Sequence, residues 1–467
     1  MLRIQKRAIS AKRISLILVD LLIFQASFAL AVIIRFGLAG APRYISERWP
    51  ATFLITPIFL IVFYVADLYQ TKKDYRRPAE SLRMASATVI SVSISIFLFY
   101  LLFYGNWSAI LGRGILALYA LLVFIGILGW RWFYSHLGIK GVFSKKVILV
   151  GDLADLAKLQ PLLQGIASDM DLKLGGLVGL GREGMPEVNS GLPILGTAHQ
   201  LLEIVNRENP DLLVVAVASE GFKPLIRDLI ASNQRGIEIR DAISFSEEYF
   251  KKIPLEFIDD LWFLISYINI PKIHVQRVKR LIDIALSLLA LMLTLPLSLL
   301  IAALIKMESR GDLFFVQERI GKDGKPFRLI KFRSMVQNAE ETTGPVWAAM
   351  EDPRVTRIGR FLRRWRLDEI PQLWNVLRGE MSLVGPRPER REFLNELKAK
   401  VPYFMERLSV KPGITGWAQI ESSYASSVEE SQLKLEFDLY YIKNVSFLLD
   451  LSILLKTLKV ITLGKGR

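Results

Sequence analysis

Four long apolar segments in the N-terminal third constrain this chain of 467 residues more than any other feature. They cover residues 14–36, about 50–68, 88–104 and 111–130. A helix of roughly 20 apolar residues can cross a bilayer, and a secretory signal peptide is shorter and ends in a cleavage site of small residues. The sequence therefore predicts four transmembrane helices within residues 1–140, of which the first is a retained anchor.

Basic residues flank these segments unequally, and this predicts their orientation. The side expected inside carries Arg3, Lys6, Arg7, Lys12 and Arg13 before the first segment, and Lys72, Lys73, Arg76, Arg77 and Arg83 between the second and third. The loops on the other side carry only Arg35, Arg43, Arg48 and Arg113. Because short cytoplasmic loops carry an excess of Lys and Arg, we expect the N-terminus in the cytoplasm and, after four spans, Lys140 as well.

Two polar residues, Asp20 and Gln25, interrupt the first apolar segment. Polar side chains inside a membrane bundle either mark a functional site or make contacts between helices. We favour contacts with neighbouring helices for both residues.

Composition excludes several kinds of chemistry. The absence of Cys excludes disulfides, thiolate metal sites and a cysteine nucleophile. Three dispersed histidines argue against a His-ligated metal and against Ser-His-Asp catalysis, so any metal should have oxygen ligands. A net charge of +15 beside 52% hydrophobic residues indicates that charge and apolar residues are segregated. We expect part of the positive charge to set the membrane topology and to meet anionic lipid, and another part to hold phosphate groups. We expect no nucleic-acid partner.

Residues 146–270 alternate short apolar strands with helical stretches, which is typical of a parallel α/β sheet. The first strand ends at Gly151, where a dinucleotide-binding fold would continue with a Gly-rich turn. Here Asp152 and Asp155 follow instead, and their charge would repel a pyrophosphate. We therefore predict a Rossmann-like domain without an intact Gly-rich motif, with a structural or interaction role; nucleotide binding is the less favoured alternative.

A fifth apolar segment at residues 281–305 has basic residues at both ends and Pro296 near its middle. Proline removes a backbone donor and bends or breaks a helix. If the segment crossed the membrane, the basic C-terminal part would lie outside, against the positive-inside bias. We predict a re-entrant helix that returns to the cytoplasmic face; an ordinary span with a proline kink is the alternative.

Charge, Gly and Pro are concentrated in residues 306–420. Lys331 and Arg333 alternate, so they share one side of an expected strand. Asp368 and Glu369 adjoin at an expected helix start, where they would point in different directions. The cations near them are Arg360, Arg363, Arg364, Arg366 and Arg378. This pattern indicates an anion site with embedded carboxylates, either a phosphoryl-transfer centre or a basic face on anionic lipid.

Six motifs, in order along the C-terminal part of the chain, form the basis of a resemblance to a known family. They are K-R-x-x-D at 279–283, F-F-x-Q-x-R-x-G at 314–321, K-F-R-S-M at 331–335, L-D-E-x-P-Q-L at 367–373, S-L-V-G-P-R-P at 382–388 and K-P-G-I-T-G-W-A-Q at 411–419. Residues 274–467 resemble the catalytic domain of the bacterial polyprenyl-phosphate hexose-1-phosphate transferases, which are monotopic phosphoglycosyl transferases. The N-terminal part is similar to the long members of that family. Arg366 departs from the family, which usually has a small hydroxyl residue at this position.

The resemblance implies transfer of a sugar-1-phosphate from a UDP-sugar to undecaprenyl phosphate, with release of UMP, at the start of exopolysaccharide, capsule or O-antigen synthesis. It implies Asp368 as the nucleophile of an aspartyl phosphosugar intermediate, Glu369 as its partner, and Mg²⁺ bridging Asp368 and the diphosphate. The implied substrate-binding residues are Lys331, Arg333 and Arg363 in the active site, Arg387 at the nucleotide, and Lys279 and Arg280 at the polyprenyl phosphate. For the last two, plain interfacial anchoring is the alternative.

The predicted fold is thus a four-helix transmembrane bundle at 1–140, a Rossmann-like α/β domain at 146–270, and a catalytic α/β-associated domain at 274–467 with the re-entrant helix. We expect a multi-pass protein of the bacterial inner membrane with its catalytic domain on the cytoplasmic face. Two other readings are a membrane-bound nucleotide-sugar dehydratase and a non-catalytic scaffold or regulator of polysaccharide assembly. The identity of the UDP-sugar stays open, and a homodimer is the candidate assembly.

Overall fold

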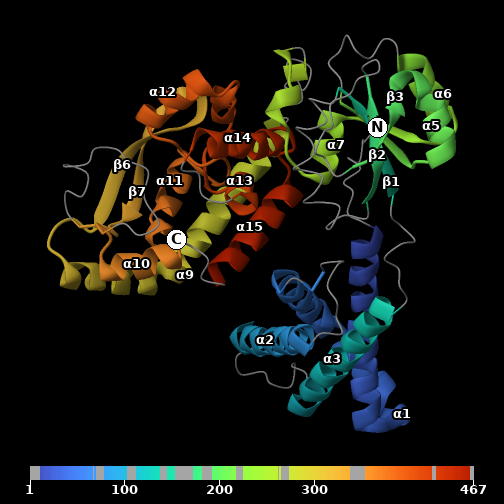
Figure 1. The fold of residues 1–467 in the computed structure, drawn as a ribbon. Helices are drawn as coiled ribbons and strands as arrows, with labels where there is room; N and C mark the ends of the chain where they lie inside the picture. The colour runs from blue at the N-terminus through green and yellow to red at the C-terminus, as the bar shows by residue number, and fades with distance from the viewer. Residues whose placement is uncertain are drawn as a thin grey trace. The chain divides into compact units, whose positions relative to one another are not determined.

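A computed structural model describes residues 11–66, 68–69, 78–102, 112–136, 145–152, 172–180, 192–216, 225–260, 262–263, 273–336, 353–422 and 427–462 (Figure 1). The chain divides into two compact units, Met1–Ala242 and Ile243–Arg467. The basic residues at positions 3, 6, 7, 72, 73, 76, 77 and 140, and Asp155, lie outside the described residues.

The N-terminal apolar segments form α1 (Ala11–Val65), α2 (Pro78–Leu102) and α3 (Arg113–His136). The first two predicted spans are joined in α1, whose helical geometry is broken at Gly37, with φ of 70°. The Phe24 and Phe59 rings on its two parts are 5.2 Å apart, so the chain doubles back and the two parts pack together. By length and composition the parts long enough to span are Ser15–Pro50, Glu80–Phe99 and Gly114–Tyr134, whereas Thr52–Val65 is shorter. The four predicted apolar segments are thus present as the two packed parts of α1 and as α2 and α3, and the second of them, Thr52–Val65, is the shortest.

Asp20 and Gln25 make the predicted contacts within this bundle. Asp20 Oδ2 accepts a hydrogen bond from Arg131 Nη2 at 2.8 Å, and both side chains are fully buried. Gln25 Nε2 donates to Thr56 Oγ1 at 3.3 Å. A buried charge is costly unless it is paired, so the ion pair between Asp20 and Arg131 compensates two charges that the apolar bundle encloses.

The second part of this unit is a parallel sheet of five strands. They are β1 (Lys145–Gly151), β2 (Leu172–Gly179), β3 (Ile194–Thr197), β4 (Leu212–Ala216) and β5 (Glu238–Asp241). Their order is β3-β2-β1-β4-β5, with every described pairing parallel. The helices α5 (Leu201–Glu208) and α6 (Ile226–Gln234) lie side by side next to the sheet (Figure 1) and bury Leu201 and Leu229 with it. The predicted Rossmann-like α/β domain is confirmed.

The second unit begins earlier than the predicted domain start at residue 274. The chain from α7 (Ala242–Tyr249) onward buries Ile253 and Leu255 in one hydrophobic cluster with Val384 and Trp417. The compact C-terminal unit thus includes residues ahead of position 274, because they contribute apolar side chains to its core.

The remaining elements belong to this unit. They are α9 (Ile273–Glu308), β6 (Phe314–Ile320), β7 (Pro326–Phe332), α10 (Arg357–Arg364), α11 (Gln372–Arg378), β8 (Ser382–Val384), α12 (Arg391–Lys400), β9 (Gly413–Thr415), α13 (Trp417–Glu421), α14 (Val428–Lys443) and α15 (Phe447–Thr462). β6 and β7 form an antiparallel hairpin, and β8 pairs with β9 in parallel. Short 3₁₀ turns include η4 (Leu255–Phe257), η5 (Lys322–Gly324), η6 (Leu367–Glu369) and η7 (Phe404–Ser409).

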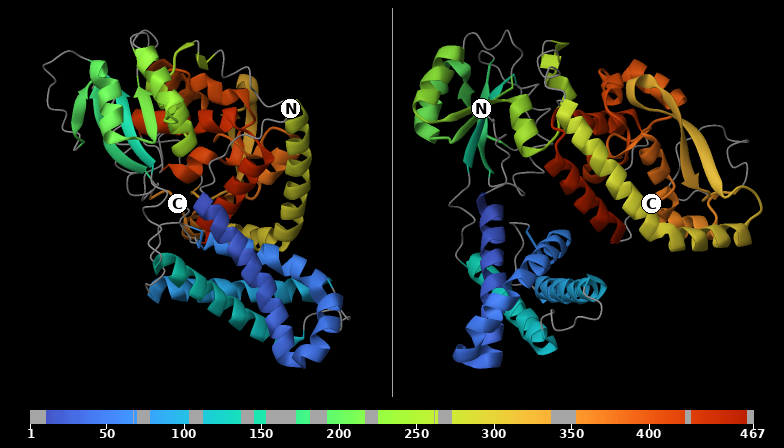
Figure 2. Two further views of the ribbon diagram at one scale, coloured as in Figure 1. Left: turned by 90° about the vertical axis from the view of Figure 1, so that its right-hand side faces the viewer. Right: turned by 180° about the vertical axis from the view of Figure 1, so that it is seen from behind.

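α9 contains Pro296 and consists of two arms joined by a bend, which Figure 2 shows most clearly in its right-hand view. Near the start of α9, Arg280 donates hydrogen bonds to the last carbonyls of α11. Near its end, Ile301 and Ile305 pack with Leu362 of α10. Both ends of this apolar helix therefore contact the same unit.

Candidate active site

Asp368 and Glu369 lie on η6, between α10 and α11, and each is 7% exposed. The turn is produced by Arg366, which adopts the left-handed conformation with φ of 51° and ends the preceding helix. Such a conformation is uncommon for a residue other than glycine and persists where the surroundings hold it. The two carboxyl groups are thus enclosed in the unit rather than exposed as ordinary helix caps.

Glu369 is surrounded by three cations. Its Oε1 lies 3.1 Å from Lys331 Nζ and 3.5 Å from Arg387 Nη1, and its Oε2 lies 3.5 Å from Arg366 Nη1. Burial alone would raise the pKa of Glu369, but the charges of Lys331 and Arg387 outweigh it and lower the pKa to about 2. Glu369 is therefore ionised and its charge is compensated.

Asp368 differs from its neighbour. Within the described ranges, its side chain makes no hydrogen bond or ion pair. Burial raises the pKa of Asp368, Glu369 raises it further, and the charges of Lys331, Arg363 and Arg387 oppose this rise. The Asp368 carboxyl group is therefore the one that is available to a substrate or a metal ion.

Lys331 reaches the acid pair from β7, and a buried amide holds this strand against α11. Asn375 of α11 accepts a hydrogen bond from Ile330 N–H at 3.1 Å and donates to Arg328 O at 2.7 Å. Asn375 is fully buried, so these bonds fix the register between the helix that follows Asp368 and the strand that carries Lys331. Asn375 was not predicted from the sequence, because a lone amide inside the L-D-E-x-P-Q-L-W-N stretch carries no distinct signal.

The other two basic residues predicted in the active site lie in different surroundings. Arg363 acts electrostatically on Asp368, and its Nε donates to Ser334 Oγ at 2.9 Å. Arg333 instead donates to the carbonyls of Ser309 and Arg310 at 2.9 and 3.1 Å, just beyond the end of α9. Arg333 therefore holds the segment that follows α9. The structure thus brings Arg363, but not Arg333, to the acid pair.

Lys279 and Arg280 also have protein partners. Lys279 Nζ lies 2.6 Å from Asp450 Oδ2 of α15. Arg280 donates to the carbonyls of Val376 and Leu377, the latter at 2.8 Å. Both residues therefore attach the first arm of α9 to the unit, and neither is brought to the acid pair by a described contact.

Arg387 reaches Glu369 from a loop built on close backbone approach. A Cβ atom at Gly413 would lie 2.1 Å from Gly385 N, and one at Gly416 would lie 2.2 Å from Gly385 O. Only glycine permits such approach. This explains in physical terms why the motifs at 382–388 and 411–419 contain these glycines: they pack the two backbone segments directly together.

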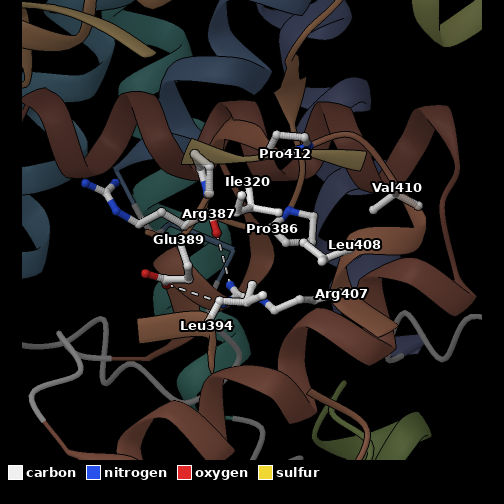
Figure 3. A pocket seen from close by; sticks show the side chains of 11 residues that line it. Ile320, Pro386, Arg387, Glu389, Leu394, Arg407, Leu408, Val410 and Pro412 are labelled. Carbon is white, nitrogen blue, oxygen red and sulfur yellow. Dashed lines mark hydrogen bonds and ion pairs between the residues drawn. The ribbon is translucent and has the colours of Figure 1, made fainter. Parts of the chain in front are cut away.

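A buried cluster of charges behind this loop was not predicted. Arg407 Nη2 lies 2.9 Å from Asp438 Oδ2. Its Nη1 lies 3.3 Å from Glu389 Oε1 (Figure 3). Burial raises the pKa of Asp438 to about 6, against the effect of Arg407. Among 60 Lys and Arg residues, nothing in the local sequence distinguishes Arg407.

No group of three or more His, Cys, Asp or Glu side chains with metal-binding geometry occurs among the described residues. Mg²⁺ does not need one, since it commonly takes one or two carboxylates and completes its shell with phosphate oxygens and water. Asp368 fits this role, because no described side chain occupies its oxygens.

Comparisons with known proteins agree with this architecture. Residues 274–464 match the family model described as "Bacterial sugar transferase", and residues 64–231 match "CoA-binding domain". The chain is 30% identical over 484 aligned residues to the UDP-glucose:undecaprenyl-phosphate glucose-1-phosphate transferase of Xanthomonas campestris pv. campestris, covering 90% of this chain and 95% of that protein. It is 29% identical to the UDP-galactose-lipid carrier transferase of Erwinia amylovora, covering 97% of each.

A third relative matches the C-terminal part more strongly. The UDP-N-acetylgalactosamine-undecaprenyl-phosphate N-acetylgalactosaminephosphotransferase of Aeromonas hydrophila is 47% identical over 189 residues. These residues are 40% of this chain and 44% of that protein.

Proposed function

The chain belongs to the bacterial polyprenyl-phosphate hexose-1-phosphate transferases, and we propose that it transfers a sugar-1-phosphate from a UDP-sugar to undecaprenyl phosphate. The products are UMP and undecaprenyl-diphosphate-sugar, and the reaction is the first membrane step of polysaccharide synthesis. One observation carries the proposal at the level of residues. A buried carboxyl group without a described partner, Asp368, lies beside a carboxylate compensated by Lys331, Arg366 and Arg387.

The proposed mechanism has two displacements at the β-phosphorus. A carboxylate oxygen of Asp368 forms a bond to this phosphorus, and the bond to the oxygen that bridges the two phosphates breaks, so UMP leaves with the electron pair. A phosphate oxygen of undecaprenyl phosphate then attacks the same phosphorus and releases the Asp368 carboxylate. Lys331 and Arg387 support the first step, since preorganised cations stabilise charge that develops on the leaving phosphate.

Magnesium is part of the proposal. Asp368 would hold the ion together with diphosphate oxygens and water. When bound, the ion would neutralise diphosphate charge. The residues of this chain bind and orient the substrate around it.

We further propose that α9 is re-entrant and that the catalytic unit lies on the cytoplasmic face of the inner membrane. Arg280 and Ile305, close to the two ends of α9, contact elements of one unit, α11 and α10 respectively. These contacts favour two ends on one side of the bilayer, as do the basic residues that flank the apolar segment.

Cysteine labelling tests this topology, because the natural chain has no Cys. In spheroplasts, Gln276→Cys and Asp312→Cys are expected to resist a membrane-impermeant maleimide and to react only after lysis. Glu47→Cys, in a predicted external loop, is the matched control that should react in intact spheroplasts. Reaction of Asp312→Cys in intact spheroplasts would contradict the re-entrant helix.

Purified protein with undecaprenyl phosphate and a panel of UDP-sugars tests the activity itself. We expect one or more UDP-sugars to yield UMP and lipid-linked diphosphosugar. EDTA should abolish both products and added Mg²⁺ should restore them. UMP release that is unchanged in EDTA would contradict the proposed requirement for Mg²⁺. A scaffold would release no UMP, and a dehydratase would alter the sugar without releasing UMP, so the panel also separates the alternatives.

A further inference from the structure

Four consecutive carbonyls hold the Pro-Arg-Pro loop in place. Pro386 O accepts from Gly413 N at 2.9 Å, and Glu389 O accepts from Ile320 N at 3.0 Å. Between them, two arginine side chains serve the remaining carbonyls. Arg407 Nη2 donates to Arg387 O at 3.1 Å and Arg319 Nη1 donates to Pro388 O at 3.4 Å. Because both prolines lack an N–H group, these carbonyls are the main backbone groups by which the loop can be fixed.

Of the two arginines, Arg407 makes the more extensive set of described contacts. It is 6% exposed, and its guanidinium carbon lies 4.9 Å from the centre of the Phe404 ring. Its charge is met by two ion pairs inside the protein, with Glu389 and Asp438. It donates at once to a backbone carbonyl of the loop, to a carboxylate at the end of the loop and to a carboxylate of α14.

The loop in turn places the Arg387 side chain. Figure 3 shows its guanidinium extending away from Arg407, while the backbone carbonyl of the same residue accepts the Arg407 hydrogen bond. On the far side, Arg387 Nη1 lies 3.5 Å from Glu369 Oε1. Arg387 thus links Arg407 to the acid pair. Its backbone carbonyl accepts a hydrogen bond from Arg407, and its side chain reaches Glu369.

We propose that Arg407 is a positioning residue of the active site, which fixes the Arg387 guanidinium beside Glu369 by clamping the backbone of the Pro386–Glu389 loop. The inference rests on the proposed function, in which Arg387 contacts the substrate. Arginine is required because its planar fork serves several acceptors at fixed angles, whereas a lysine ammonium is a single point.

A double-mutant cycle tests this role. Arg407→Lys should lower kcat/KM about 10-fold, mainly by raising KM for the UDP-sugar, and Arg387→Ala should lower it about 100-fold. If Arg407 acts through Arg387, the double variant should match Arg387→Ala within about twofold. A purely structural role would reduce activity in both backgrounds, so a loss of about 1,000-fold in the double variant would overturn the inference.

Two further variants keep the test decisive. Arg391→Lys, at an exposed ion pair with Glu318, is the matched control and should leave kcat/KM unchanged. If Arg407→Lys does not fold, as judged by its thermal melt, Asp438→Asn loosens the same clamp and replaces it in the cycle. An active wild type with a multiplicative cycle contradicts only the positioning role, whereas an inactive wild type contradicts the proposed function and the inference with it.

Discussion

Asp368→Asn is expected to lower UMP release at least about 1,000-fold, because the amide has the shape of the carboxylate but cannot act as a nucleophile. The fold should survive. Burial penalises the charged form of Asp368, as the raised pKa indicates, and no described ion pair is lost on substitution. The variant should therefore melt at or above the temperature of the wild type, and a coupled assay for UMP measures the loss of activity.

An exposed aspartate provides the matched control for this substitution. Asp323 lies in a turn with φ of 57°, a left-handed conformation that Asn also tolerates, so Asp323→Asn should be fully active. Mass spectrometry adds a direct readout. In the absence of undecaprenyl phosphate, the peptide that contains Asp368 should gain the mass of one sugar phosphate. Full activity in Asp368→Asn would contradict the nucleophile assignment.

The central side chains of the candidate site could be predicted because they occur in local sequence motifs. Asp368, Glu369 and Lys331 occur in short motifs, and the structure brings them within one cluster. Arg333 was predicted on the same basis, since alternation puts it on the same side of a strand as Lys331. It differs because β7 ends at Phe332, and beyond that point the side chain turns to the carbonyls that follow α9.

Long-range partners could not be predicted from one sequence. Arg407 is 20 residues from the loop carbonyl that it holds and 31 residues from Asp438. The start of the C-terminal compact unit also depends on long-range contacts, so it could not be predicted from the sequence. Alternating strands and helices indicated the α/β domain, but nothing local indicated that Ile253 and Leu255 are buried with Trp417. By contrast, the break in α1 at Gly37 directly follows the predicted end of the first apolar segment at residue 36.

Lys331→Met should lower kcat/KM about 100-fold and also change its dependence on pH. Asp368 must be ionised to attack, so activity falls as the pH drops through the pKa of Asp368. The positive charge of Lys331 lowers this pKa, and its removal raises the pKa. The acidic limb of the pH profile should therefore move to higher pH.

Glu369→Gln should move the acidic limb in the opposite direction, because the negative charge of Glu369 raises the pKa of Asp368. Lys331→Arg is the matched control, since it keeps the positive charge and should leave the limb near its wild-type position. Profiles of kcat/KM against pH for the three variants measure these shifts. Removing a positive and a negative neighbour must shift the pKa of Asp368 in opposite directions. If the acidic limbs of Lys331→Met and Glu369→Gln coincide, the ionisation that controls activity is therefore not that of Asp368.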